Sequence, residues 1–134
     1  MFLFDTDAIT NLLKKIPSKT LIENISKLDK SEQYISSITV GEIAYGAFKS
    51  KNPEFHLNNL ENILLPSVNI LDFDASAAFI YGRIRSELEK NGDIISNTDM
   101  QIASIAIDNN LTLITGNMRH FQRIKDLQIE NWLT

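Results

Sequence analysis

Three acidic residues and one amide, far apart in the sequence, each stand where a predicted strand ends or in the first turn of an adjoining helix: Asp5, Glu42, Asp99 and Asn117. The carboxyl ends of parallel strands open onto the crevice where α/β proteins bind ligands, so these side chains are predicted to converge. Carboxylates in one crevice repel one another unless a cation neutralises them or one of them stays protonated. Oxygen ligands without cysteine or a nearby histidine favour Mg²⁺ or Mn²⁺ over zinc.

Such a site suits phosphodiester chemistry. A divalent cation lowers the pKa of a bound water, orients it for in-line attack and stabilises charge on the departing oxygen. We therefore predict that Asp5, Glu42 and Asp99 are catalytic and bind Mg²⁺ or Mn²⁺. The competing interpretation is that all three acids are helix-terminus residues, favoured there by capping and by the helix dipole. Capping explains one acid more readily than three acids at different strand ends.

The elements that must position these residues follow from apolar periodicity and from helix caps and breakers. The predicted strands are residues 1–4, 34–38, 68–73, 111–115 and 127–132. The predicted helices are residues 8–16 (ended by Pro17), 18–28 (capped by Ser18), 40–49 (preceded by Thr39), 55–65 (ended by Pro66), 75–90 (capped by Asp74) and 99–109 (capped by Asn97 or Thr98). Alternating strands and helices predict an α/β fold with a mostly parallel central sheet of about five strands, covered by helices on both faces.

Composition limits the class of protein. With 134 residues, 43% of them apolar, the chain is expected to be one domain with a substantial core. It has no cysteine, no apolar run that could cross a membrane and no signal-peptide pattern, so we expect a soluble, cytoplasmic protein. The net charge of −4 argues against binding nucleic acid through overall attraction, so a local patch or bound cations would have to overcome it.

Four segments in order resemble the successive motifs of PIN-domain ribonucleases. They are the opening apolar run with Asp5-Thr6-Asp7, residues 38–46 (ITVGEIAYG), residues 97–103 (NTDMQIA), and residues 113–117 (LITGN) followed by Phe121. Within that family the chain is most similar to the VapC toxins of bacterial toxin–antitoxin pairs. The resemblance covers nearly the whole chain, and it lies in the four motifs together.

The resemblance implies a single PIN domain over residues 1–134 and an Mg²⁺- or Mn²⁺-dependent endoribonuclease that inhibits translation. Asp5, Glu42 and Asp99 match the three acidic metal ligands of the family, and Thr6 and Thr115 match positions that orient acids or water. Three positions depart from the family pattern: Asn117 replaces a fourth acid, Asn97 stands where an Asp is common, and Asp7 stands where Asn is frequent. These departures leave open whether one or two metal ions act.

The implied partners are RNA, a VapB-type antitoxin and a second copy of the chain, with no role for a membrane. An acidic pocket is a natural receptor for a basic antitoxin side chain, because an arginine there can pair with two carboxylate oxygens. Apolar residues within 21–28 and 55–64 offer faces for a partner helix or a second subunit, and core packing is the competing use.

Two other functions are compatible with parts of the sequence. Asp5-Thr6-Asp7 also resembles the opening of haloacid-dehalogenase-type phosphatases, with Asp5 as the nucleophile. That family requires a later lysine and a further acidic pair, and only 17 residues follow Asn117. The second alternative is a non-catalytic module whose acidic pocket binds a cation or a basic segment.

Five further side chains receive structural interpretations. We expect His56 and His120 to be surface or turn residues, because no partner acid stands at a recognisable sequence spacing from either. We expect Trp132 to be a core or dimer-contact aromatic. Arg83 and Arg85 lie two apart on a helix, so we expect them to face different directions.

Overall fold

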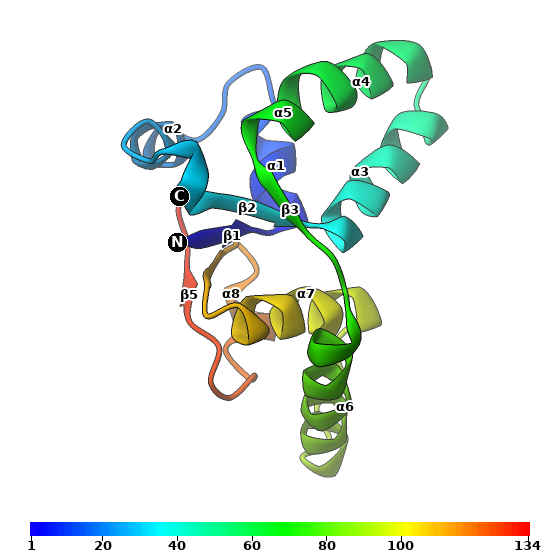
Figure 1. Cartoon of the computed structure of the whole chain (residues 1–134), viewed down its shortest axis with the longest axis vertical. Coiled ribbons are helices and arrows are strands. Elements are labelled where there is room, and N and C mark those ends of the chain that lie inside the picture. The colour runs from blue at the N-terminus through cyan, green and yellow to red at the C-terminus, as the bar shows by residue number, and fades with distance from the viewer.

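The computed structural model describes all of residues 1–134 and contains one five-stranded sheet in the order β3-β2-β1-β4-β5 (Figure 1). Every neighbouring pair is parallel. The strands are β1 (Phe2–Phe4), β2 (Gln33–Ser36), β3 (Asn69–Leu71), β4 (Thr112–Ile114) and β5 (Ile129–Glu130). The predicted α/β class and parallel sheet are confirmed, although each strand is shorter than its apolar run.

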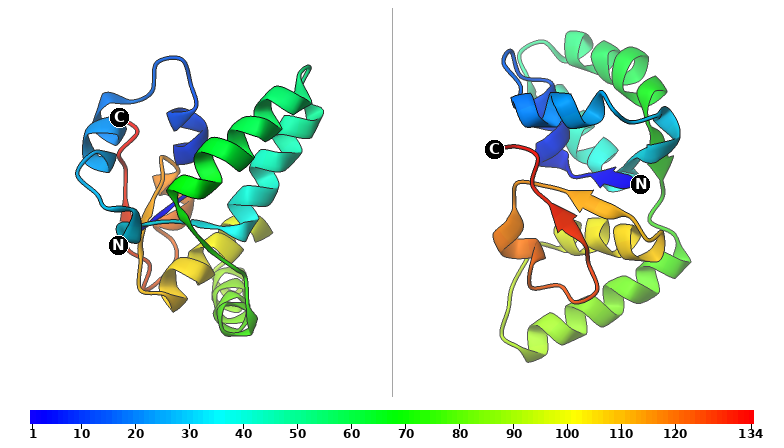
Figure 2. Two further views of the ribbon diagram at one scale, coloured as in Figure 1. Left: turned by 45° about the horizontal axis from the view of Figure 1, so that its top comes forward. Right: turned by 90° about the vertical axis from the view of Figure 1, so that its left-hand side faces the viewer.

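Helices cover both faces of this sheet (Figures 1 and 2). They are α1 (Thr6–Leu12), α2 (Lys19–Ile25), the 3₁₀ turn η1 (Lys30–Glu32), α3 (Ser37–Lys49), α4 (Pro53–Asn59), the π-helical turn η2 (Leu60–Leu64), α5 (Leu65–Ser67), α6 (Ala75–Lys90), α7 (Asn97–Asp108) and α8 (Met118–Phe121). No helix is both long enough and apolar enough to span a bilayer.

The core divides into two clusters, one on each face of the sheet. Successive side chains of a strand point to opposite faces. Accordingly, the paired residues Leu3 and Leu113 join the cluster built on α6 and α7, while the next pair, Phe4 and Ile114, joins the cluster that contains α1 and Trp132. Both faces of the sheet are therefore buried, as is usual for a parallel sheet.

The strand order places a topological switch point between β1 and β4. The chain passes from β1 to β2 and β3 on one side, then crosses back to add β4 and β5 on the other side. Asp5 follows β1 directly and Thr115 follows β4, so both stand at the carboxyl ends that flank the switch point. Ligand sites of open α/β sheets form at such a position.

Several predicted helix boundaries are wrong, and local hydrogen bonding explains each case. Helix α3 begins at Ser37 because Ser36 caps it, so Thr39 is buried inside the first turn. Helix α7 is capped by Ser96, whose hydroxyl accepts from the Asp99 N–H, and the predicted caps Asn97 and Thr98 lie within the helix.

Proline did not end helices where we predicted. Helix α1 ends at Leu12, before Pro17. Pro66 instead lies within α5, directly after the π-helical turn η2. Proline is tolerated in the first turn of a helix, where its missing N–H costs no hydrogen bond. The caps at Ser18 and Asp74 and the bounds of α6 are confirmed.

The apolar face predicted within residues 21–28 is used for core packing. Leu21 is fully buried, and Ile25 and Leu28 pack against the same cluster. In the second predicted face, Leu60 and Leu64 are buried, whereas Phe55 on α4 is 55% exposed. Ile22 on α2 (44% exposed) and Ile63 in η2 (61% exposed) also remain open, so each predicted face is used only in part for core packing.

The Phe121 side chain anchors α8 in the core, and its removal should lower the stability of the folded protein. Its side chain is fully buried in the cluster of α6 and α7. We expect Phe121→Ala to lower the free energy of unfolding by about 3–5 kcal/mol, through lost burial and the cavity left behind. Phe79→Ala is the matched control, because Phe79 is 85% exposed. Urea denaturation measures both, and equal losses would contradict this description of the core.

Candidate active site

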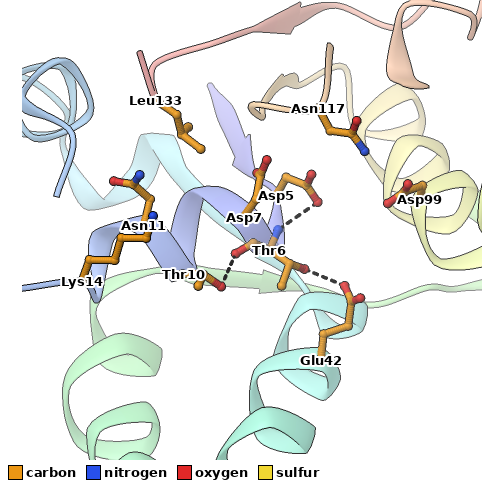
Figure 3. A pocket seen from close by; sticks show the side chains of 10 residues that line it. All are labelled: Asp5, Thr6, Asp7, Thr10, Asn11, Lys14, Glu42, Asp99, Asn117 and Leu133. Carbon is orange, nitrogen blue, oxygen red and sulfur yellow. Dashed lines mark hydrogen bonds between the residues drawn. The ribbon is translucent and has the colours of Figure 1, made fainter. Parts of the chain in front are cut away.

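A cavity of about 480 Å³ opens beside the switch point and is lined almost entirely by polar side chains (Figure 3). Leu133 is its only apolar member. The lining residues are Asp5, Thr6, Asp7, Thr10, Asn11, Lys14, Glu42, Asp99, Asn117 and Leu133. The structure thus brings together five of the six predicted site residues. The sixth, Thr115, lies behind the wall and is fully buried.

Asp5 is both a helix cap and a wall of the cavity. Its Oδ1 accepts the Thr6 N–H at 2.8 Å, and its Oδ2 accepts the Thr115 hydroxyl at 2.8 Å. The capping interpretation is therefore correct for Asp5 without excluding a chemical role. Only 5% of Asp5 is exposed. Burial, followed by repulsion from Asp7, raises the pKa of its carboxyl to about 7, against the opposing effect of its hydrogen bonds.

Asp7 is a fourth carboxylate of the cavity that sequence reasoning did not place among the site residues. Its Oδ2 accepts the Gly116 N–H at 2.9 Å. Burial raises the pKa of the Asp7 carboxyl, and hydrogen bonds oppose that shift. A side chain at position 116 would meet Asp7 Oδ2 at 3.1 Å and Leu133 Cδ2 at 3.2 Å, so glycine allows this close approach. The sequence did carry a signal for Asp7, because it is the second Asp shortly after the first predicted strand.

Glu42 faces the aspartates from α3 on another side of the cavity (Figure 3). The Thr6 hydroxyl donates to Glu42 Oε1 at 2.6 Å. Glu42 lies in the second turn of α3, not the first, because the helix begins earlier than predicted. Thr6 therefore joins the start of α1 to the wall that α3 contributes.

Asp99 and Asn117 form the remaining side of the cavity, and His120 contacts both from outside the lining. His120 Nδ1 lies 3.5 Å from Asp99 Oδ2 and 2.9 Å from Asn117 Nδ2. His120 lies at the surface as predicted, with its side chain 42% exposed, but sequence spacing did not reveal its contact with Asp99. The missed signal was the three-residue spacing from Asn117, which places both side chains on one turn of α8 and its cap.

Asn97 does not line the cavity. Its Oδ1 accepts the Tyr81 hydroxyl at 3.0 Å on the far side of the α7 start. Arg83 and Arg85 form exposed ion pairs with Glu87 and Glu89 respectively, so both are solvated side chains of α6. These ion pairs lie outside the acidic cavity.

Trp132 is a core residue, and His56 lies at the surface. The Trp132 ring is buried, with its centroid 4.9 Å from that of Phe2, so its core role is confirmed. His56 is an exposed residue of α4 that lines a second groove, described below with the function.

The donor chemistry of the cavity suits Mg²⁺ or Mn²⁺, since carboxylate and amide oxygens are the ligands those ions prefer. A cation would also neutralise the like charges that raise the pKa of Asp5. However, no three His, Asp or Glu side chains are grouped closely enough to form a ligand set. The acidic side chains thus line one cavity, but they do not converge on a single position.

Comparison with known proteins agrees with this arrangement. The family model of the PIN domain matches residues 2–127. Ribonuclease VapC2 of Rickettsia felis is 41% identical, covering 98% of both chains. The tRNA(fMet)-specific endonuclease VapC of Salmonella typhimurium is 37% identical, covering 98% of this chain and 97% of that protein.

Solved structures give the same result. The crystal structure of VapBC2 from Rickettsia felis, bound to a promoter DNA fragment, contains a chain that superimposes with a TM-score of 0.90 at 40% identity, covering 98% of both chains. DNA-bound VapBC from Salmonella typhimurium gives a TM-score of 0.88 at 36% identity, covering 98% of this chain and 97% of that one. The chain belongs to the PIN domain family and, within it, to the VapC ribonucleases. This assignment overturns the haloacid-dehalogenase alternative.

The raised pKa of Asp5 predicts how metal-free stability depends on pH. A carboxyl whose pKa is higher in the folded state favours folding when protonated. That stability is fully present below the ordinary value of 3.8 and is lost as the pH rises through about 7. The protein in EDTA should therefore become less stable between about pH 4 and pH 7, with a loss of about 1.4 kcal/mol for each unit of pKa shift.

Asp5→Asn should remove much of this pH dependence and be more stable than wild type at pH 8, because an amide carries no charge to bury. Asp7 contributes in the same direction, so some dependence should remain. Denaturation midpoints at several pH values provide the measurement. Identical pH profiles for the two proteins would contradict the assigned burial of charge.

Proposed function

We propose that this protein is an Mg²⁺- or Mn²⁺-dependent endoribonuclease, the toxin of a toxin–antitoxin pair, which inhibits translation by cutting RNA. The observation that carries the proposal is the gathering of Asp5, Glu42 and Asp99 around one polar cavity at the switch point of a PIN fold. Relatives named as a ribonuclease and an endonuclease, which this chain matches over nearly their full length, support the proposal.

The residues have distinct roles in this proposal. Asp5, Glu42 and Asp99 would hold the cation, which when bound supplies a water of lowered pKa and stabilises charge on the leaving oxygen. Thr115 holds Asp5, and Thr6 holds Glu42, each through a hydroxyl donor. These two bonds keep the acidic side chains on the cavity wall.

Lys14 is the one cationic side chain that lines the cavity. In a protein with a net charge of −4, a phosphate backbone needs such local attraction to approach the acids. We therefore assign Lys14 to phosphate binding at the rim of the site, where its charge offsets repulsion between RNA and the carboxylates.

A non-catalytic binding module is the second candidate, favoured by the absence of a closed group of ligands. An RNA-cleavage assay with and without EDTA distinguishes the ribonuclease from the binding module. The ribonuclease requires cleavage of RNA that stops in excess EDTA and resumes with Mg²⁺ or Mn²⁺. The binding module requires cation binding without cleavage.

Removal of each acid tests the ribonuclease directly. We expect Asp5→Asn, Glu42→Gln and Asp99→Asn each to lower the rate of RNA cleavage by more than about 100-fold, because even residues that only support metal ligands contribute about 10–100-fold. The metal-free melting temperature should stay level or rise, since like charge is removed.

The matched control is Asp108→Asn, which removes a carboxylate from the other end of α7, where it bonds to Ser76. Its cleavage rate should equal that of wild type. Cleavage that continues in excess EDTA, or losses that merely follow the folded fraction in all three site variants, would contradict metal-dependent catalysis at this cavity.

An antitoxin of the VapB type is the proposed partner, since the structures of the relatives are VapBC complexes. A groove of about 520 Å³ lies between α1, α3 and α4 and shares Thr6, Thr10, Lys14 and Glu42 with the acidic cavity. Its floor and sides are partly apolar, with Ile43, Phe55 and Leu60 among the lining residues. An antitoxin segment in this groove would bring a basic side chain to the carboxylates. We also propose that the toxin is a homodimer.

Obstruction of the groove should weaken antitoxin binding. Gly46 lines the groove on α3, and no atom lies within 4 Å of a Cβ placed there. We expect Gly46→Leu to reduce recovery of the co-expressed antitoxin by at least about tenfold, a loss of about 1.4 kcal/mol. Gly82→Leu on α6 is the control, because that position is equally open but remote from the groove. Equal recovery with both variants would exclude the groove as the docking site.

A further inference from the structure

Two fully buried hydroxyl side chains, Ser36 and Thr39, lie behind the part of the cavity wall that Glu42 forms. Ser36 Oγ is 3.2 Å from Thr39 Oγ1, and Thr39 Oγ1 is 3.1 Å from Thr6 Oγ1. Thr6 Oγ1 is in turn 2.6 Å from Glu42 Oε1. Neither buried hydroxyl lines the cavity, yet both connect to one of its acids.

The hydrogen bonds of this hydroxyl chain (Ser36, Thr39 and Thr6) converge on Thr39. The Thr39 N–H donates to Ser36 Oγ at 3.0 Å, and the Ser36 hydroxyl donates back to Thr39 Oγ1. Thr39 Oγ1 also accepts from the Thr6 hydroxyl, whose other acceptor is Glu42 Oε1. Thr6 has a single hydroxyl proton, so Thr39 and the carboxylate share it. The buried Thr39 and the acid therefore hold the Thr6 hydroxyl between them.

This arrangement makes Thr39 the buried acceptor that holds the Thr6 hydroxyl beside Glu42. Hydrogen bonds in a chain polarise and strengthen one another, most of all away from water. Because Thr39 is fully buried, solvent is not in place to substitute for its hydroxyl. Loss of that hydroxyl would leave the Ser36 proton without its acceptor and Thr6 without its buried partner, and Thr6 would be free to turn away from Glu42.

We propose that Thr39 is a positioning residue for Glu42, acting through Thr6. The inference rests on the proposed function of the acidic cavity and adds a residue to it that touches neither substrate nor cation. It also gives a chemical reason for the threonine that ends up inside the first turn of α3.

Two substitutions of Thr39 by residues of similar size distinguish a positioning role of its hydroxyl from a role in core packing alone. Thr39→Val keeps the shape and removes the hydroxyl, whereas Thr39→Ser keeps the hydroxyl and removes a methyl group. We expect Thr39→Val to weaken Mn²⁺ binding and to lower the cleavage rate, each by about tenfold, in the range for residues that support metal ligands. Thr39→Ser should restore both values. Ser104→Ala, which removes an equally buried hydroxyl bonded only within α7, should change neither.

A double-mutant cycle shows whether Thr39 acts through Glu42. Calorimetric titration with Mn²⁺ is performed on wild type, Thr39→Val, Glu42→Ala and the double variant. Thr39→Val should have no further effect once Glu42 is absent. A loss of the same size in both backgrounds, or greater damage from Thr39→Ser than from Thr39→Val, would overturn the proposal.

Crystals of the metal-free variants give a readout independent of any activity. The Glu42 carboxylate should remain on Thr6 in wild type and Thr39→Ser, and be displaced or disordered in Thr39→Val. A wild-type protein that neither binds Mn²⁺ nor cleaves RNA would refute the proposed function alone, because Glu42 order still tests the hydroxyl chain. An unchanged Glu42 in Thr39→Val crystals would refute the positioning role alone, whatever the activity.

Discussion

The burial of the Asp5 carboxylate between the ends of β1 and β4 is the constraint on which the rest of the site depends. The Asp5 N–H extends the sheet ladder to Ile114 O at 2.9 Å, and its side chain accepts from Thr6 and Thr115. A buried carboxylate is costly unless its oxygens are hydrogen-bonded. The two strand ends therefore have to present donors here, and the donors hold the acid at the edge of the cavity.

Neighbouring acids add repulsion to this cost, and the fold opposes it with hydroxyl and backbone donors. The Gly116 N–H supports Asp7, Thr115 supports Asp5, and Thr6 supports Glu42. Each donor stands at the end of a strand or the start of a helix, where backbone groups are otherwise unpaired. Burial and mutual repulsion nevertheless raise the pKa of Asp5. The site is thus electrostatically strained in a way that a cation would relieve.

The acidic cavity and the apolar groove are two parts of one depression that α1 and α3 share. Thr6, Thr10, Lys14 and Glu42 line both. In the proposed function, catalysis and its control by a partner would therefore use neighbouring surfaces of the same helices. A segment seated in the groove would lie within reach of the carboxylates, so inhibition would need no long-range conformational change.

The sequence by itself determined the α/β class, the parallel sheet and three of the acids, because apolar periodicity and residues after strand ends are local patterns. It did not determine the contacts of His120 or the place of Thr39 inside α3. The His120 contact with Asp99 joins residues on α8 and α7, and the Thr39 contact with Thr6 joins α3 to α1. Such contacts depend on where helices begin and how they pack across the sheet, so only the tertiary structure decided them.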